Sequence, residues 1–446
     1  MPSSLAKSLV TDARVAAADT LADLRTGLLL DAAFDRRASE LDARDRRWTQ
    51  ELVWGMLRKR GYIDHLLAPR VRGGIARLDA DLVDLLRLGV HQLFHMGSVP
   101  PYAAIAQTVE LAKQRHGLGA SKLANAVLRR LDRERGELLA PPLPADPVEA
   151  LAIEMSHPRW LVARWVARWG AEQTRALLEA NNREAPLIVR PWGVVREQLE
   201  AMLEASGVSV GDAPLVEDSL LLAPGTMVTS LGAFQQGNFF VQDPAATLVT
   251  RYAAIPDGAR VADLCAAPGG KTVELARTAA YVTAADSSEA RLGRLQETIE
   301  RLDLDQVTAV VVDARDAGTL GTFDAVLVDA PCTGTGTFRR HPDARWRLRT
   351  SDLAVMAAAQ RAVLRGAADA VAPGGLLIYS TCSLEPEEND AQIEAFLLDN
   401  PDWTLEPPPV GAVPESVLDA GRLRVLPQRH GTDGSFAARL RRGAAA

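Results

Sequence analysis

The sequence lacks any uninterrupted apolar run that approaches the roughly 18 residues of a membrane-spanning helix. Its first residues, MPSSLAKSLVTDARVAA, also lack the apolar stretch of a secretory signal peptide. Cysteine is scarce, because the chain has only Cys265, Cys332 and Cys382 and contains no CxxC motif. Three such cysteines do not look like a disulfide framework, and a redox pair is conceivable but has no CxxC motif to support it. We therefore expect a cytoplasmic protein with no membrane segment and with reduced thiols.

Motifs that bind phosphates or metals are missing as well. The glycine-rich segment VADLCAAPGGKT at residues 261–272 contains neither GxGxxG nor GxxxxGK[ST]. It therefore predicts neither a dinucleotide site nor an ATP site. Histidine and cysteine residues do not cluster into a set of four ligands, which argues against zinc. We expect no metal centre.

Length and composition are those of a soluble globular protein with two or three domains. The 446 residues are 47% hydrophobic and 24% charged. The net charge of −7 is unevenly distributed, because residues 1–140 carry 22 Lys and Arg against 17 Asp and Glu. A mildly basic N-terminal part beside an acidic remainder is compatible with a nucleic-acid partner, and equally with an ordinary solvated surface.

Apolar spacing predicts an all-α domain over residues 1–140, because apolar positions recur there at helical intervals. Pro100, Pro101, Gly117 and Gly119 are expected to separate its helices.

The segment APPLPADPVEA contains four prolines and predicts a Pro-rich linker at residues 141–150. Residues 151–235 have a mixed pattern and predict a small α+β connecting subdomain. Its stripe of Trp160, Trp165 and Trp169 favours core packing over base stacking.

Residues 236–446 alternate between apolar runs of strand length and helical stretches, which predicts a Rossmann-like α/β domain with a parallel sheet. Ligands of such sheets bind outside the carboxyl ends of the strands. The motifs of interest all follow strands, so one crevice can collect them. The expected strands are RVADLCA, AYVTAAD, VTAVVVD, FDAVLVDAP and GGLLIYSTC.

The first of these strands leads into a turn of small residues, which lets the backbone approach a ligand closely. The second strand ends in Asp286, which is suited to hydrogen bonding with ribose hydroxyls. The third ends in Asp313, placed to accept from an adenine amino group. A nucleoside pocket without a phosphate cradle fits S-adenosylmethionine. The small residues of the turn are Ala266, Ala267, Gly269 and Gly270.

Two thiols follow the last two strands. A thiolate that adds to cytosine C6 makes C5 nucleophilic enough to take a methyl group, so thiols beside a methyl donor suggest C5 methylation. Asp329 is the expected partner of cytosine N3, and Lys271 can stabilise charge in the same crevice. Cys265 is interpreted as a small lining residue. The residues alone leave open whether Cys332 or Cys382 attacks.

Several segments resemble the NOL1/NOP2/Sun family of RNA cytosine-C5 methyltransferases. They are DLCAAPGGKT, DAPCTGTG, STCS, FQQGNFFVQD, FRRHPDARW and HGTDGSF. The N-terminal segments PPYAAIAQTVELAK and ANAVLRRL look like the NusB RNA-binding fold. Within the family, this combination resembles the bacterial enzymes that act on 16S rRNA.

The resemblance implies S-adenosylmethionine as cofactor and small-subunit rRNA as partner. It places the nucleophile at Cys382 and the product-release cysteine at Cys332. The implied cofactor contacts are Cys265, Ala266, Ala267, Pro268, Gly269, Gly270, Lys271, Asp286, Asp313 and Asp329. Two positions depart from the family pattern, Arg190 in place of an asparagine and Ser435 in place of an aromatic residue.

The arginine-rich segment FRRHPDARWRLR follows the Cys332 loop directly. Arg339, Arg340 and Arg345 are expected to neutralise RNA phosphates, and Phe338 or Trp346 to stack on a base. The alternative is a solvated charged surface.

Two further functions remain open, the same chemistry on tRNA and a non-catalytic RNA-binding assembly factor. The paired thiols argue against a mere binder. We expect a monomer.

Overall fold

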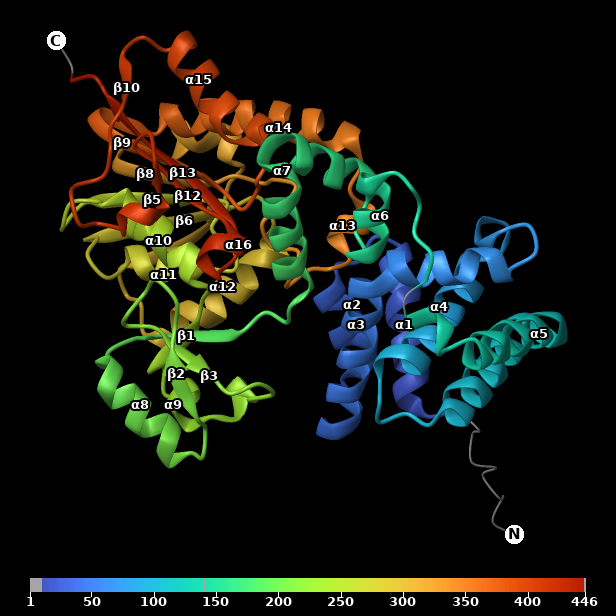
Figure 1. The fold of residues 1–446 in the computed structure, drawn as a ribbon. Helices are drawn as coiled ribbons and strands as arrows, with labels where there is room; N and C mark the ends of the chain where they lie inside the picture. The colour runs from blue at the N-terminus through green and yellow to red at the C-terminus, as the bar shows by residue number, and fades with distance from the viewer. Residues whose placement is uncertain (1–9, 140, 445–446) are drawn as a thin grey trace. The chain divides into compact units, whose positions relative to one another are not determined.

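The computed structural model describes residues 10–139 and 141–444 (Figure 1). The first residues of the predicted helical domain and its boundary at residue 140 lie outside the described residues. The chain divides into two compact units. The helical unit comprises Met1–Asn182 with His341–Arg347, and the sheet unit comprises Arg183–Arg340 with Leu348–Ala446. The predicted subdomain at 151–235 is thus divided, because its first helices pack in the helical unit.

The helical unit confirms the all-α prediction. Acidic side chains cap several of its helices; Asp42, for example, accepts hydrogen bonds from the backbone of Arg44 and Asp45 at the start of α3. Its helices are α1 (Asp12–Arg25), α2 (Leu30–Ala38), α3 (Ala43–Leu67), α4 (Ala80–His95), α5 (Pro101–Arg133), α6 (Pro147–Glu154), α7 (Arg159–Asn182) and α13 (Ala344–Arg347), with 3-10 turns at Ala68–Arg70, Ile75–Arg77 and Glu137–Leu139.

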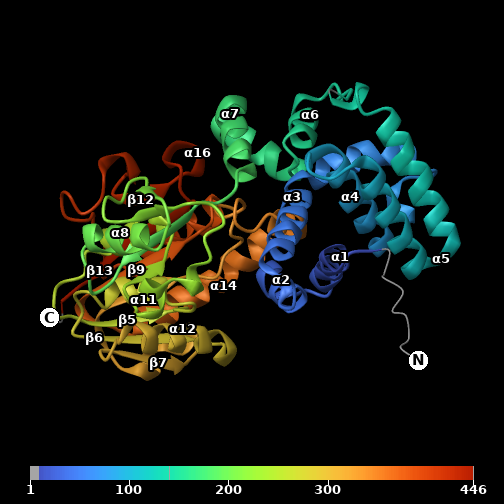
Figure 2. The ribbon, with the colours of Figure 1, turned by 90° about the horizontal axis from the view of Figure 1, so that it is seen from below.

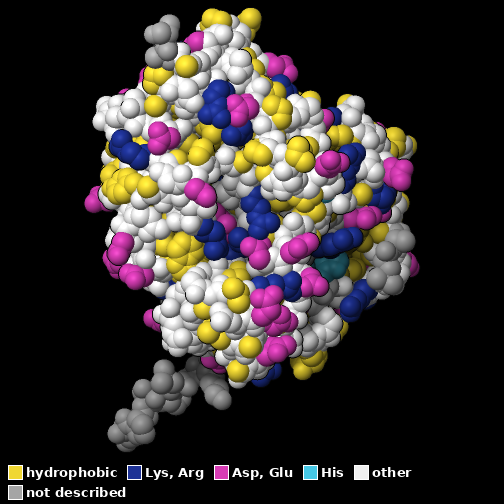
Figure 3. Space-filling model, turned by 90° about the vertical axis from the view of Figure 1, so that its left-hand side faces the viewer, with side chains coloured by type: hydrophobic (Ala, Val, Ile, Leu, Met, Phe, Trp, Pro, Cys, Tyr) yellow, Lys and Arg dark blue, Asp and Glu magenta, His cyan; other side chains and the backbone are white. Residues whose placement is uncertain are grey.

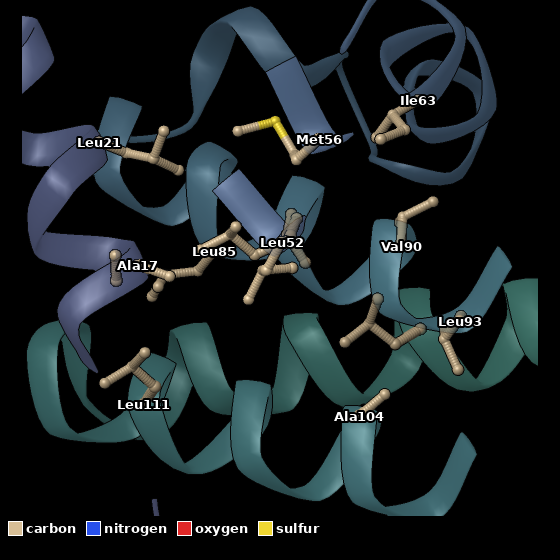
Figure 4. Close-up of a cluster of buried hydrophobic side chains, with 14 of the residues drawn as sticks. Ala17, Leu21, Leu52, Met56, Ile63, Leu85, Val90, Leu93, Ala104 and Leu111 are labelled. Carbon is tan, nitrogen blue, oxygen red and sulfur yellow. The ribbon is translucent and has the colours of Figure 1, made fainter. Parts of the chain in front are cut away.

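One continuous core holds α1 to α5 together. Leu52 and Met56 of α3 lie among side chains of α1, α4 and α5 and are fully buried (Figure 4). Each fully buried aliphatic side chain contributes about 1.5–3 kcal/mol to the free energy of unfolding.

Proline and glycine mark the helix boundaries largely as predicted. Pro101 occupies the first position of α5, where its missing N–H costs nothing. Gly117 interrupts α5 with φ 81°, whereas Gly119 lies within the helix. The predicted linker at 141–150 is shorter in the structure, because Pro147 begins α6 instead of preventing a helix. Trp165 is 1% exposed, as expected for a core residue.

The sheet unit begins with a small four-stranded sheet of order β2-β3-β1-β4. Strand β1 pairs antiparallel with both β3 and β4. Leu199 and Leu203 of α8 are buried in a core shared with these strands. The elements are β1 (Leu187–Pro191), α8 (Arg196–Ala205), β2 (Val210–Asp212), β3 (Leu220–Leu222), a 3-10 turn (Val228–Ser230), α9 (Gly232–Gln235) and β4 (Phe239–Val241).

The large sheet has the order β11-β12-β13-β9-β8-β5-β6-β7, and β10 pairs with β13. Its strands from β9 to β7 are parallel and confirm the predicted Rossmann-like core, whereas β10 to β13 add an antiparallel edge. The strands are β5 (Arg260–Leu264), β6 (Tyr281–Asp286), β7 (Val307–Val311), β8 (Phe323–Asp329), β9 (Val371–Thr381), β10 (Trp403–Leu405), β11 (Leu418–Asp419), β12 (Arg422–Val425) and β13 (Ser435–Arg442).

Helices cover both faces of this sheet, as Figures 1 and 2 show. Neighbouring residues of β5 point to opposite faces: Val261 joins the core under α10 and α12, and Ala262 joins the core under α14 and α15. The helices and turns are α10 (Pro244–Ala253), α11 (Gly270–Leu275), α12 (Glu289–Leu302), η5 (Ala314–Leu320), α14 (Thr350–Asp369), η6 (Pro386–Glu388), α15 (Asp390–Asp399), η7 (Glu415–Val417) and α16 (Pro427–His430).

The strand order reverses between β5 and β8, since β6 and β7 lie on one side of β5 and β9 lies beyond β8. Such a switch point opens a crevice outside the carboxyl ends of the strands. The glycine turn follows β5 and the two later cysteines follow β8 and β9, so the fold brings all three segments to this edge. No helix within the described residues is long and apolar enough to cross a membrane.

Candidate active site

The turn after β5 requires glycine at its centre. Gly269 has φ 106° and precedes α11. A Cβ atom there would lie 2.4 Å from Cδ1 of Leu295 in α12, so a larger residue would force the Leu295 side chain to move and would be strained at this positive φ. The turn is closed by a hydrogen bond of 2.8 Å from the Gly269 N–H to the Ala266 carbonyl. The backbone of the turn therefore packs closely against α12.

Asp286 ends β6 and is buried. Its Oδ1 accepts from the Ser288 N–H at 2.9 Å and from Arg291 Nη2 at 2.7 Å. Its Oδ2 is buried and has no hydrogen-bond partner among the described residues. A buried acceptor without a partner is costly, and a ligand hydroxyl would satisfy it.

Asp313 is held differently. It caps η5 through the Arg315 N–H at 2.9 Å and pairs with the Arg315 guanidinium at 2.6 Å. The hydrogen bonds from Arg315 hold the pKa of the Asp313 carboxyl at about 2. Both carboxylate oxygens are therefore engaged by Arg315, and contact with a ligand requires sharing them.

Asp263 is a site residue that the sequence analysis missed. It lies in β5, is fully buried, and accepts a hydrogen bond of 2.6 Å from Thr272 Oγ1 at its Oδ2. Its Oδ1 has no partner among the described residues. Burial raises the pKa of the Asp263 carboxyl to about 7, against the opposing effect of the Thr272 hydrogen bond. The sequence offered one sign of this residue, because an acid inside the apolar run RVADLCA indicates a buried carboxyl group.

Lys271, at the start of α11, and Asp329, at the end of β8, form an ion pair. Lys271 Nζ lies 2.6 Å from Asp329 Oδ2, and Ser380 Oγ donates to Asp329 Oδ1 at 2.8 Å. Burial disfavours the charged lysine, but the Asp329 carboxylate outweighs it and the pKa of Lys271 is raised. Lys271 also interacts electrostatically with Cys382, so its charge reaches the thiols.

The two thiols that follow β8 and β9 lie against each other, with Cys332 Sγ 3.3 Å from Cys382 Sγ. The hydrogen bond with Cys382, burial, and the charges of Cys382 and Glu388 raise the pKa of the Cys332 thiol well above its usual value. Cys332 therefore keeps its proton in the free protein. Sequence proximity to strand ends predicted that the two thiols share a crevice, and the structure adds their direct contact.

Cys265 differs from this pair. Burial, followed by the carboxylates of Asp329, Asp286 and Asp263, raises the pKa of the Cys265 thiol to about 12. A thiol with such a pKa is a poor nucleophile at neutral pH. The position therefore suits the lining role expected of it.

Two glycines allow the thiol loops to meet a third segment, HGTDGSF, closely. The Gly336 N–H donates to the Cys382 carbonyl at 2.9 Å, and the Gly434 N–H donates to the Gly336 carbonyl at 2.8 Å. A Cβ atom on Gly336 would lie 2.7 Å from the Cys382 oxygen and 2.8 Å from Gly434 Cα. Three segments that are far apart in the sequence thus interlock around Cys382.

Comparison with known proteins identifies families that match each part of the chain. A family model for the 16S rRNA methyltransferase RsmB/F matches residues 253–441, a NusB family model matches 11–133, and a ferredoxin-like domain of the RsmF/B type matches 157–229. The probable ribosomal RNA small subunit methyltransferase B of Bacillus subtilis is 35% identical over 91% of this chain and 92% of its own length.

This chain belongs to the RsmB/F family of 16S rRNA methyltransferases. Ribosomal RNA small subunit methyltransferase B of Pseudomonas putida agrees, with 36% identity over 87% of this chain and 89% of its own. The crystal structure of PH0851 superimposes with a TM-score of 0.82 at 28% identity, covering 96% of this chain and 98% of that one. The family resemblance seen in the sequence motifs is confirmed.

The RsmB/F motifs around the thiols are joined by a buried ion cluster. Arg339 Nη2 and Arg340 Nη2 each lie 2.6 Å from Asp243 Oδ2, and both guanidinium groups also pair with Asp433. Burial works against the charge of Asp243, but Arg340 and Arg339 outweigh it and lower its pKa. The segments FQQGNFFVQD, FRRHPDARW and HGTDGSF therefore meet in one cluster.

This cluster corrects the expectation for Arg339. Its side chain is 7% exposed and spans two carboxylates, so it is engaged within the protein rather than presented to phosphates. Arg340 is 27% exposed but holds the same two carboxylates. Phe338 is fully buried and has no face for a base.

Arg345 also departs from the expectation of an exposed phosphate-binding residue. It belongs to the helical unit, is fully buried, and donates to Asn182 Oδ1 at 2.8 Å and to the Asn181 carbonyl at 3.0 Å. Burial, reinforced by the charge of Arg58, lowers the pKa of Arg345 to about 9. Trp346 donates its indole N–H to the Leu57 carbonyl at 2.8 Å. On the face shown in Figure 3, basic side chains are interspersed with acidic ones.

The two departures from the family pattern have structural roles. Arg190 of β1 is 2% exposed and pairs with Glu274 of α11 through Nε at 2.8 Å. Ser435 of β13 donates to the Thr381 carbonyl at 3.3 Å, directly before Cys382. Arg190 thus joins the small sheet to α11, which follows the glycine turn, and Ser435 supports the strand end that carries Cys382.

Proposed function

We propose that this protein methylates C5 of a cytosine in 16S rRNA, with S-adenosylmethionine as methyl donor and a covalent link between Cys382 and cytosine C6. The contact between the Cys332 and Cys382 sulfur atoms, beside the Lys271–Asp329 pair, carries the proposal. A transfer to oxygen or nitrogen needs no paired thiols, whereas C5 is a poor nucleophile until a thiolate adds to C6.

The residues of the turn fit S-adenosylmethionine. Asp286 offers a buried acceptor oxygen that has no hydrogen-bond partner among the described residues and suits a ribose hydroxyl. Gly269 and Gly270 let the turn pack against Leu295 and Gln242, and S-adenosylmethionine has no phosphate that the turn would have to cradle. Asp313 is assigned to the adenine side of the pocket, and the remaining turn residues from Cys265 to Lys271 line it. S-adenosylmethionine supplies a methyl group on a positively charged sulfur.

The protein supplies the nucleophile and the charges around the ring. Cys382 as thiolate adds to C6, and Lys271 stabilises its negative charge beforehand. Asp329 is assigned to cytosine N3, where a hydrogen bond withdraws electron density as C6 is attacked. Addition of the thiolate to C6 breaks the C5–C6 double bond and releases its electron pair towards C5. This pair forms the new C5–methyl bond, while the bond between the methyl group and the donor sulfur breaks.

Release needs a base for the C5 proton. The electron pair of the C5–H bond restores the C5–C6 double bond, and the C6–S bond breaks to return Cys382 as thiolate. Cys382 is itself a cause of the raised pKa of Cys332, and this cause weakens once the Cys382 sulfur is bonded to C6. Cys332 therefore ionises more easily in the adduct than in the free protein, which suits the release step.

Bisulfite mapping of total RNA from cells with and without the protein tests the proposal. We expect one protein-dependent 5-methylcytosine in 16S rRNA. A protein-dependent 5-methylcytosine in tRNA alone would contradict the substrate, and its absence from all RNA would contradict the chemistry. An RNA-binding assembly factor without activity predicts the last result.

A further inference from the structure

A fully buried carboxylate lies behind the two thiols and has no part in the mechanism so far. Glu388 is 0% exposed, and among the described residues no cation pairs with it. Its carboxylate accepts from the Thr333 N–H at 2.9 Å and from Gln360 Nε2 at 2.9 Å. The hydroxyl groups of Thr333 and Ser383 also donate to it.

The donors to Glu388 come from both thiol loops. Thr333 directly follows Cys332, and Ser383 directly follows Cys382. Gln360 of α14 adds a second link to the Cys332 loop, because its Nε2 also donates to the Pro331 carbonyl at 2.9 Å. One carboxylate thus connects the residues that immediately follow both cysteines.

The Glu388 backbone is itself fixed in place. Tyr379 of β9 donates its hydroxyl to the Glu388 carbonyl at 2.7 Å, and the Glu388 N–H donates to the Glu385 carbonyl at 3.1 Å. Burying a carboxylate without a cation costs several kcal/mol unless donors satisfy it. Four donors on one carboxylate meet this need and make its position rigid.

We infer that Glu388 is a positioning residue that holds the Cys332 and Cys382 thiols in contact. The inference deepens the proposed function and rests on it for its catalytic consequence, since release requires Cys332 beside the sulfur that leaves. The thiol contact itself does not depend on the proposed function, because it rests on hydrogen bonds within the protein, those around Glu388 among them. Loss of the carboxylate frees the side chains of Thr333 and Ser383 together, so the two thiols beside them are held less firmly in contact.

Two variants and a matched control test the inference in the full-length protein. Glu388→Ala removes every acceptor, and Glu388→Gln keeps one carbonyl oxygen but turns an amide N–H₂ towards the donors. Glu394→Ala in α15 is the control, because its carboxylate side chain is 67% exposed. Circular dichroism and S-adenosylmethionine affinity establish that each variant is folded.

The first readout is the contact between the thiols. Diamide takes two electrons and two protons from a thiol pair and leaves a disulfide, which peptide mapping assigns to Cys332 and Cys382. We expect the rate of this coupling to fall at least about 10-fold in Glu388→Ala, less in Glu388→Gln, and not in Glu394→Ala. The second readout is methyl transfer, which should fall by about 100-fold in Glu388→Ala with unchanged cofactor affinity.

The outcomes separate this inference from the proposed function. Folded Glu388 variants that couple their thiols at the wild-type rate would overturn the positioning role, whatever their activity. A wild-type protein that methylates no cytosine C5, with coupling still dependent on Glu388, would refute the proposed function and leave the positioning role standing. Slower coupling together with slower methyl transfer supports both.

Discussion

The thiol loops and the arginine-rich segment after the first of them both stand out in the sequence, yet folding uses them in opposite ways. Cys332 and Cys382 follow the ends of β8 and β9, are half-buried and lie in contact with each other. Arg339 and Arg345, which a linear reading presents to RNA, are turned inward and buried. A cysteine that directly follows a strand lies at the edge of the sheet wherever that strand ends. The position of an arginine on a loop depends instead on hydrogen-bond and ion-pair partners that are distant in the sequence.

The largest expected effect is the loss of methyl transfer when Cys382 is replaced. Cys382→Ser replaces a thiolate by a hydroxyl that stays protonated at neutral pH, so methyl transfer should fall by at least about 1,000-fold. Tritium transfer from labelled S-adenosylmethionine to 16S rRNA measures it. Cofactor affinity should be unchanged. Retained transfer in the folded variant would show that Cys382 is not the nucleophile.

Substitution of a buried arginine should lower the stability of the protein. Arg339→Ala leaves Asp243 and Asp433 buried with one guanidinium instead of two, and the free energy of unfolding should drop by about 3–5 kcal/mol. Arg349→Ala, at an exposed position of the same segment, should change it by less than about 0.5 kcal/mol. Urea denaturation gives both values.

The RNA affinity of Arg339→Ala distinguishes a structural role of this arginine from a role in phosphate binding. If Arg339 contacted phosphates instead, its removal would weaken RNA binding and reduce the salt dependence of affinity without a loss of stability. A stable Arg339→Ala protein with weakened RNA binding would therefore restore the original expectation for this residue.

The buried Asp263 carboxyl, which has no ion-pair partner among the described residues, gives a pH-dependent effect that is smaller per pH unit. Asp263 has a folded-state pKa of about 7, above the value of about 3.9 in an unfolded chain. Between these values the folded state holds one more proton than the unfolded state. The free energy of unfolding therefore falls as pH rises, by at most about 1.4 kcal/mol per pH unit.

Asp263→Asn removes this proton uptake. The stability of the variant, measured by urea denaturation from pH 4 to pH 7, should lose that part of the slope. An identical slope in the wild type and the variant would show that the Asp263 carboxyl does not titrate in this range.

Much of the fold follows from local sequence. The strands β5 to β9 are apolar runs bounded by polar turns, and their burial on both faces makes them easy to identify. The antiparallel edge was not predicted, because β13 carries Arg439, Arg441 and Arg442 along its length. Arg439 and Arg441 find Glu406 as partner only in the folded chain.

Some residues of the candidate site can likewise be predicted from the local sequence, and others cannot. Local sequence identifies Cys332, Cys382 and the glycine turn, because strand ends and small residues have a fixed geometric meaning. Glu388 could not be found, since the stretch EPEEN resembles an acidic surface loop. Its donors lie at Thr333, Gln360 and Ser383. Only the long-range fold shows that this acid is buried.

The central claim is a covalent bond between Cys382 and the target cytosine, resolved with the help of Cys332. The most direct measurement is mass spectrometry of Cys332→Ala after incubation with 16S rRNA and S-adenosylmethionine. We predict a stable RNA–protein adduct whose cross-linked peptide contains Cys382. Quantitative turnover by Cys332→Ala without any adduct, or an adduct on a peptide other than that of Cys382, would contradict the account.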